Sequence, residues 1–270
     1  MNGTEWKEQH APNLVLKQWQ EAIAAWVQVK GLPPLSQEEL MMDLTFDVGQ
    51  IMLMFRKGKL ETFWGTHGEP KGYPAEMAQL FVSLLHLATT ANVDLSKEVA
   101  SVMEFNYSRA ARVVHPTPEQ PSRKEDNMEP VGTGTGTIEE VKTEAPKAPA
   151  MPPPPQGADL NAWCKYVNDW AQSKGWNDSP LHIGDALMLM VTELAEAKEE
   201  DRKRPNQPNS YHYEDTDKGP KLCGLPSELA DAVIRIFHFC GRAGINLEQV
   251  ICEKMVYNQK RAYRHGGLAS

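Results

Sequence analysis

The chain has 270 residues, with 28 Lys and Arg against 36 Asp and Glu, so its formal net charge is -8. This acidic balance argues against a protein that binds the phosphate backbone of nucleic acids, because such proteins carry clustered basic side chains. No apolar run approaches the roughly 20 residues that span a bilayer, and the first residues lack the basic-then-apolar pattern of a signal peptide. We therefore expect a soluble, cytoplasmic protein whose partner is neither nucleic acid nor membrane.

Two segments of the chain resemble each other. Residues 72–113 and 224–265 align without a gap at an offset of 152, with 12 identities in 42 positions. Upstream, an offset of 144 aligns two tryptophans of each segment: Trp19 and Trp26 with Trp163 and Trp170. This self-similarity predicts a tandem duplication of one folding unit of about 100 residues. The predicted units are a first repeat, residues 13–113, and a second repeat, residues 159–268.

The segment between the repeats, residues 114–158, differs in composition. Residues 115–156 hold ten of the chain's 20 prolines, a GTGTGT run and few large apolar side chains. Such a segment cannot bury enough apolar surface to offset the entropy of ordering it. It predicts a disordered, proline-rich linker.

The second repeat predicts four helices, over residues 160–175, 181–204, 226–240 and 247–267. In the first helix the apolar residues recur at helical spacing and form one stripe: Leu160, Trp163, Val167 and Trp170. The last helix has a similar inward face: Leu247, Val250, Ile251 and Met255. Because strand signals are scarce, we expect an all-α protein in which each repeat is a helical bundle.

Acidic pairs occur on the second and third of these helices. Glu193 and Glu196 are three residues apart, as are Glu228 and Asp231, so each pair lies on one helical face. Two such faces opposed across a bundle would bring four carboxylates together, which is costly unless a cation binds there. Oxygen ligands suit Mg²⁺, with Mn²⁺ as the alternative ion. One ExxE alone would more often be a solvated charged face, but two pairs on consecutive helices favour a metal site.

Basic and amide side chains follow on the fourth helix. Lys254, Asn258 and Arg261 recur at spacings of four and three, so they share a face that could bind a polyphosphate, with Arg264 beyond them. For Arg261 and Arg264 the alternative is a basic helix end that complements the helix dipole.

The cysteines and the segment before the third helix give weaker signals. The four cysteines are in no CxxC or Cys/His metal spacing, so we expect reduced packing residues and no zinc site: Cys164, Cys223, Cys240 and Cys252. Residues 205–223 predict a loop that either contacts a nucleobase through Tyr211, His212 and Tyr213 or is a solvated insertion.

The order of these motifs resembles the MazG-like, all-α nucleoside triphosphate pyrophosphohydrolases. The resemblance rests on ExxE, then ExxD, then KMVYNQKR and a terminal HGG, and covers residues 160–267 and, in degenerate form, residues 16–113. It implies that Glu193, Glu196, Glu228 and Asp231 hold Mg²⁺ and are the catalytic residues. It also implies that Lys254 and Asn258 contact phosphate, and that a nucleoside triphosphate is cleaved to the monophosphate and pyrophosphate.

The family assembles as dimers or tetramers, so the resemblance implies that the two repeats pack as an intrachain pseudo-dimer; a further homodimer of chains stays open. The family's usual EExxE reads TELAE here, which leaves a supporting role for Glu199 or Glu200 open.

The first repeat departs from the pattern. Its counterparts of the four carboxylates are Asp47, Gln50, Glu76 and Gln79, and Val102 aligns with Lys254. With two acidic ligands and the lysine replaced, we expect this repeat to be non-catalytic, and the apolar residues of DVGQIMLMF suggest a buried packing surface.

Two alternatives to this enzyme stay open. One is a scaffold without turnover that binds nucleotides or proteins, which exposed apolar surface on the first repeat would favour. The other is an enzyme like phosphoribosyl-ATP pyrophosphohydrolase.

Overall fold

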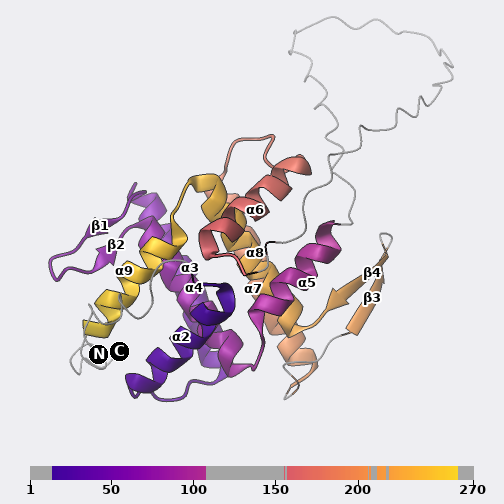
Figure 1. Cartoon of the computed structure of the whole chain (residues 1–270), viewed down its shortest axis with the longest axis horizontal. Coiled ribbons are helices and arrows are strands. Elements are labelled where there is room, and N and C mark those ends of the chain that lie inside the picture. The colour runs from indigo at the N-terminus through magenta and orange to yellow at the C-terminus, as the bar shows by residue number, and fades with distance from the viewer. Residues whose placement is uncertain are drawn as a thin grey trace, which may run out of the picture.

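A computed structural model of the protein describes residues 14–107, 155, 157–205, 207, 212–216 and 219–260 (Figure 1). In these residues the chain forms eight helices and two small antiparallel sheets, so the predicted all-α class is confirmed. The elements come in two series of the same order. The first is α2 (Leu16–Val29), α3 (Gln37–Arg56), β1 (Phe63–Trp64), β2 (Pro70–Lys71), α4 (Tyr73–Thr90) and α5 (Leu95–Tyr107). The second is α6 (Leu160–Ser173), α7 (Ile183–Lys203), β3 (His212–Thr216), β4 (Gly219–Cys223), α8 (Leu225–Ala243) and α9 (Leu247–Lys260).

The four helices predicted for the second repeat are present, and their apolar stripes face the core. The stripe of α6 and the inward face of α9 are buried, at most 7% exposed. Asp159 begins α6 as its N-cap, because its carboxylate accepts a hydrogen bond from the Ala162 backbone N–H at 2.7 Å. Most of the predicted linker, residues 114–154, lies outside the described residues. Within the described part of the chain, no helix has both the length and the apolar character needed to cross a membrane.

The third helix of each series begins in the same way. Gly72 precedes α4 with φ 98°, and Gly224 precedes α8 with φ 135°, a region that side-chain-bearing residues rarely adopt. Pro74 and Pro226 then stand in the first helical turn, where the missing N–H costs nothing. Both halves therefore have Gly-x-Pro at this place for a conformational reason.

Helices α4 and α8 form the centre of the molecule. Most residues of each helix are buried, as expected for a helix surrounded by protein. They meet through aromatic side chains: Phe81 and Phe237 have ring centroids 5.8 Å apart, and Tyr73 meets Phe239 edge-on at 5.3 Å. The buried residues of both halves thus form one continuous core.

The last helix of each series packs against the other series. Helix α5 lies along α8, and α9 lies along α4, as Figure 1 shows. Helices α3 and α7 also contact each other. Each central helix is therefore completed by the C-terminal helix of the opposite half.

The predicted loop at residues 205–223 is partly a hairpin. Strands β3 and β4 pair in antiparallel register, with His212 opposite Cys223 and Tyr213 opposite Leu222. A shorter hairpin, β1 with β2, occupies the same place in the first series. The sequence did not indicate these strands because they are short and mainly polar, and so lack a clear alternation.

The close packing of α6 on α8 predicts that alanine destabilises the protein at Gly241 of α8 but not at Gly49 of α3. A Cβ at Gly241 would lie 2.3 Å from the Cys164 carbonyl oxygen, whereas a Cβ at Gly49, in α3, would meet nothing within 4 Å. Gly241→Ala should lower the free energy of unfolding by about 1–3 kcal/mol, and Gly49→Ala should raise it by about 0.5–1 kcal/mol. Urea denaturation of the two variants measures both changes. Equal effects would contradict the described α6–α8 contact.

Candidate metal and substrate site

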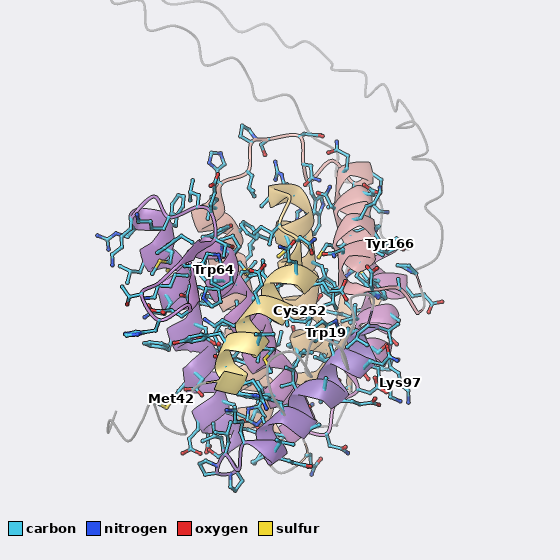
Figure 2. All side chains as sticks on the ribbon, turned by 60° about the vertical axis from the view of Figure 1, so that its left-hand side comes forward. Trp19, Met42, Trp64, Lys97, Tyr166 and Cys252 are labelled. Atoms are coloured by element: carbon cyan, nitrogen blue, oxygen red, sulfur yellow. The ribbon has the colours of Figure 1, made fainter. Side chains whose placement is uncertain are left out.

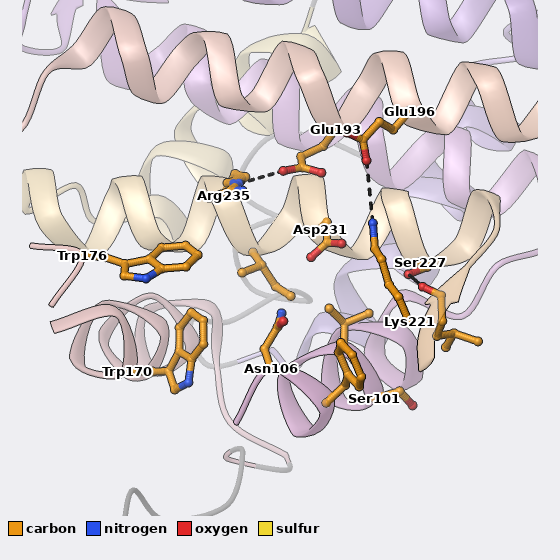
Figure 3. Close-up of a pocket in the computed structure, with 14 residues that line it drawn as sticks. Ser101, Asn106, Trp170, Trp176, Glu193, Glu196, Lys221, Ser227, Asp231 and Arg235 are labelled. Atoms are coloured by element: carbon orange, nitrogen blue, oxygen red, sulfur yellow. Dashed lines mark hydrogen bonds and ion pairs between the residues drawn. The ribbon is translucent and has the colours of Figure 1, made fainter. Parts of the chain in front are cut away.

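Helices α7 and α8 bring the predicted carboxylates together. One oxygen each of Glu193, Glu196 and Glu228 lies within 4.8 Å of the others. Glu193 and Glu228 are buried, and Glu196 is exposed. Asp231, one turn further along α8, lines a cavity together with Glu193 and Glu196 (Figure 3). The spacing of three within each pair and the packing of α7 on α8 produce this arrangement.

Ionising the buried carboxylates of this cluster is costly. Burial raises the pKa of the Glu228 carboxyl group to about 8, and burial with the nearby Glu193 carboxylate raises the pKa of Asp231 to about 7. Glu228 Oε2 is buried and has no hydrogen-bond partner in the described part of the chain. An unpaired buried oxygen within an all-oxygen donor set fits a hard divalent cation such as Mg²⁺.

Two basic side chains that were not predicted from the sequence contact the carboxylates. Lys221 Nζ, from β4, is 3.7 Å from Glu228 Oε1 and 3.9 Å from Glu196 Oε2. Arg235 Nε donates a hydrogen bond to Glu193 Oε1 at 2.9 Å. Arg235 could have been found, because it follows Asp231 by four residues and so shares its helical face. Lys221 had no such signal, since a hairpin carries it to the site.

A cavity of about 220 Å³ opens beside the cluster. Its wall opposite α8 comes from α5 of the first half: Ser101, Val102, Phe105 and Asn106. Trp170 and Trp176 close one end, with ring centroids 5.5 Å apart (Figure 3). The Arg235 guanidinium lies 5.7 Å from the Trp176 ring centroid. The cavity thus combines carboxylates, two cations and aromatic rings, drawn from both halves of the chain.

The structure does not bring Lys254 and Asn258 to this cavity. Helix α9, which carries both, packs against α4, and Lys254 Nζ is 3.7 Å from Glu76 Oε2 of the first half. These two residues therefore lie away from the four carboxylates, because the last helices are exchanged between the halves. Their contact with phosphate stays a prediction. Val102 and Asn106, their aligned counterparts on α5, line the cavity instead. Arg261 and Arg264 lie outside the described residues.

At the corresponding place in the first half, the polar side chains form hydrogen bonds with one another. Asp47 Oδ2 accepts a hydrogen bond from Ser83 Oγ at 2.6 Å, and Gln79 Nε2 donates to the same oxygen of Ser83 at 3.3 Å. Burial raises the pKa of Asp47 to about 6, and the Lys254 ammonium opposes this shift. Both halves place an ammonium group beside the carboxylates, Lys254 here and Lys221 in the second half. The difference is that Ser83 donates to Asp47 here, whereas Glu228 Oε2 has no hydrogen-bond partner in the described part of the chain.

Other acidic and aromatic candidates lie away from the cavity. Glu199 forms an exposed ion pair with Arg202, and Glu200 is buried in ion pairs with Lys203 and Arg204. On the hairpin Tyr213 is exposed, and the hairpin residues that line the cavity are Lys221 and Leu222.

Comparison of the chain with protein-family models, with curated protein sequences and with solved structures gives no match. A functional assignment therefore depends on the geometry and chemistry of the site itself.

Proposed function

We propose that the protein is a Mg²⁺-dependent nucleotide pyrophosphohydrolase of the MazG-like type. The observation that carries the proposal is the group of converging carboxylates on α7 and α8, with the buried Glu228 Oε2 unpaired. Glu193, Glu196, Glu228 and Asp231 would hold the ion. When bound, Mg²⁺ neutralises charge on a triphosphate and polarises the water that attacks it.

The chain's own residues would bind and orient the substrate. Lys221 and Arg235 are the cations beside the carboxylates, so they take the phosphate-binding role first expected of Lys254 and Asn258. Asn106, from α5, offers an amide on the facing wall. The aromatic wall of Trp170, Trp176 and Phe105 suits the flat face of a nucleobase.

Hydrolysis requires one proton to be accepted. A water oxygen bonds to phosphorus, the P–O bond of the anhydride between the α and β phosphates breaks, and pyrophosphate leaves with the bonding electrons. The side chain of Glu196 is 48% exposed, whereas Glu193 is held by Arg235 and Glu228 is buried. Glu196 is therefore the carboxylate best placed to meet the incoming water and accept its proton.

The same proposal includes the organisation of the chain. The two series of elements would be a tandem duplication packed as an intrachain pseudo-dimer. Its second half would hold the metal, and its non-catalytic first half would supply the α5 wall. The identical element order and the exchange of α5 and α9 support this interpretation.

A panel of ribo- and deoxynucleoside triphosphates and phosphoribosyl-ATP tests the activity. We expect pyrophosphate release from at least one compound with Mg²⁺ or Mn²⁺, and loss of release when a chelator removes the ion. Preferential turnover of phosphoribosyl-ATP would favour the related histidine-pathway chemistry. Absence of pyrophosphate from every compound with either ion would refute the proposal.

One observation favours the second candidate, a protein-interaction scaffold. Helix α3 exposes large apolar side chains: Met42 is 72% and Phe46 is 64% exposed, and Met42 reaches the surface in Figure 2. Leu53 and Phe55 are also exposed, so the expected buried packing surface of DVGQIMLMF is only partly present. A scaffold would bind nucleotide or protein in the same assay without releasing pyrophosphate.

A further inference from the structure

The β3–β4 hairpin brings together three side chains of different donor chemistry. His212 and Cys223 are directly opposite each other in the strand register, and Glu214 is two residues along β3, on the same face as His212. One donor atom of each residue lies within 4.8 Å of the other two. His212 Nε2 is 3.2 Å from Glu214 Oε1, and Cys223 is buried. Ten residues lie between His212 and Cys223 in the sequence, so no short motif indicated this cluster.

A fourth residue, Glu200, lies close to the imidazole of His212. His212 Nδ1 is buried and has no hydrogen-bond partner in the described part of the chain, and it lies 3.6 Å from Glu200 Oε2. Glu200 is itself fixed at the end of α7, since Lys203 and Arg204 each donate to it at 2.9 Å. A carboxylate that accepts from one imidazole nitrogen leaves the other free, which is the usual arrangement behind a metal-bound histidine.

We propose that His212, Glu214 and Cys223 bind a Zn²⁺ ion, with Glu200 accepting a hydrogen bond from His212 Nδ1. A nitrogen, an oxygen and a sulfur donor suit zinc, whereas the all-oxygen cluster on α7 and α8 suits Mg²⁺. On binding, the thiol proton of Cys223 passes to solvent, a zinc–sulfur bond forms, and water takes the fourth position. This site is separate from the proposed pyrophosphohydrolase site and does not depend on it.

The ion would also affect the neighbouring carboxylates. Lys221 lies two residues before Cys223 on β4, and its ammonium contacts Glu196 and Glu228. A metal that joins β3 to β4 above the end of α7 fixes the strand that carries this lysine. Zinc bound to the hairpin therefore positions Lys221 at the carboxylate cluster.

Cobalt provides a direct spectroscopic test with the full-length protein. After chelator treatment, titration with Co²⁺ should produce visible bands of tetrahedral intensity and a near-ultraviolet thiolate-to-cobalt charge-transfer band that saturates at one equivalent. Cys223→Ser should abolish the charge-transfer band. Cys252→Ser is the matched control, because Cys252 is a half-buried cysteine on α9 that forms no disulfide, and it should leave the band unchanged.

Two further variants distinguish the hairpin site from the carboxylate cluster on α7 and α8. Glu200→Gln should weaken Co²⁺ binding by about 10- to 100-fold while retaining the charge-transfer band, because it removes the partner of His212 and no ligand. Glu228→Gln should leave the band and its stoichiometry unchanged. Absence of the band in the unmodified protein, its persistence in Cys223→Ser, or its loss in Cys252→Ser or Glu228→Gln would overturn the proposal.

Discussion

Glu228→Gln is expected to reduce pyrophosphate release by at least about 100-fold in saturating Mg²⁺, because the amide cannot supply the negative charge that a metal ligand provides. Glu228 is the only one of the four acidic residues whose buried oxygen lacks a partner in the described part of the chain, so its loss should affect the ion most directly. Initial rates with the best nucleotide of the panel, over a range of Mg²⁺ concentrations, measure the effect.

The same substitution should stabilise the metal-free protein. At pH 8 an ionised Glu228 is a buried charge next to Asp231, and burial is the main cause of its raised pKa. A neutral glutamine of similar shape removes this buried charge and its repulsion of the Asp231 carboxylate. The urea concentration at the midpoint of unfolding, measured in chelator, should therefore rise. A gain in stability with a loss of turnover distinguishes a metal ligand from a residue that merely supports the fold.

Glu76→Gln is the matched control, since Glu76 is the counterpart of Glu228 in the first half. Its carboxylate faces Lys254, and the two side chains are only 15% and 12% exposed. Breaking this pair should lower the free energy of unfolding by about 1–3 kcal/mol and leave pyrophosphate release within about twofold of the unmodified protein. If Glu76→Gln abolished turnover and Glu228→Gln did not, the site would be assigned to the wrong half.

The stability of the metal-free protein is expected to fall as the pH rises from 6.5 to 8. The folded-state pKa values of Asp231 and Glu228, about 7 and about 8, exceed those of the unfolded chain, so the folded protein binds more protons in this window. By linkage, stability present at low pH is lost as each group ionises. The loss across the window should be on the order of 2–3 kcal/mol.

Two partly buried histidines have the opposite effect at lower pH. Burial lowers the pKa of His238 to about 4 and also lowers that of His86, so both histidines make stability rise with pH up to about 6.5. Thermal melting in chelator at several pH values should show the decline above that point. Excess Mg²⁺ should flatten it, because a bound ion favours the ionised carboxylates, and Glu228→Gln should reduce it. A metal-free melting temperature that stays constant from pH 6.5 to 8 would contradict the raised pKa values of Asp231 and Glu228.

The helices of the second half and the pairing of carboxylates on α7 and α8 could be predicted from the sequence because they depend on local spacing. The stripe of Trp163 and Trp170 and the three-residue spacing of Glu228 and Asp231 are properties of one helix, and the structure retains them. Arg235 belongs to the same class of signal, since the helical period alone places it beside Asp231.

The partners of those helices could not be predicted in the same way. Two similar repeats offer each central helix two similar last helices, its own and that of the other half, and helical periodicity does not distinguish between them. Lys254 was predicted to contact phosphate in the same half as the four carboxylates, yet Val102, from the other half, lines the cavity beside them. Likewise, His212 lies opposite Cys223 because β3 pairs with β4 in this register. The spacing of the two residues along the sequence does not indicate this contact.

The wall that α5 contributes to the cavity bears on why both halves of the chain are retained together. Ser101, Phe105 and Asn106 are encoded with the half that lacks a full set of carboxylates, yet they face the carboxylates of the other half. A gene shortened to residues 159–268 would encode all four carboxylates and only part of the cavity wall beside them. Under the proposed function, selection on the chemistry of the second half would therefore also preserve the first half, which supplies this wall.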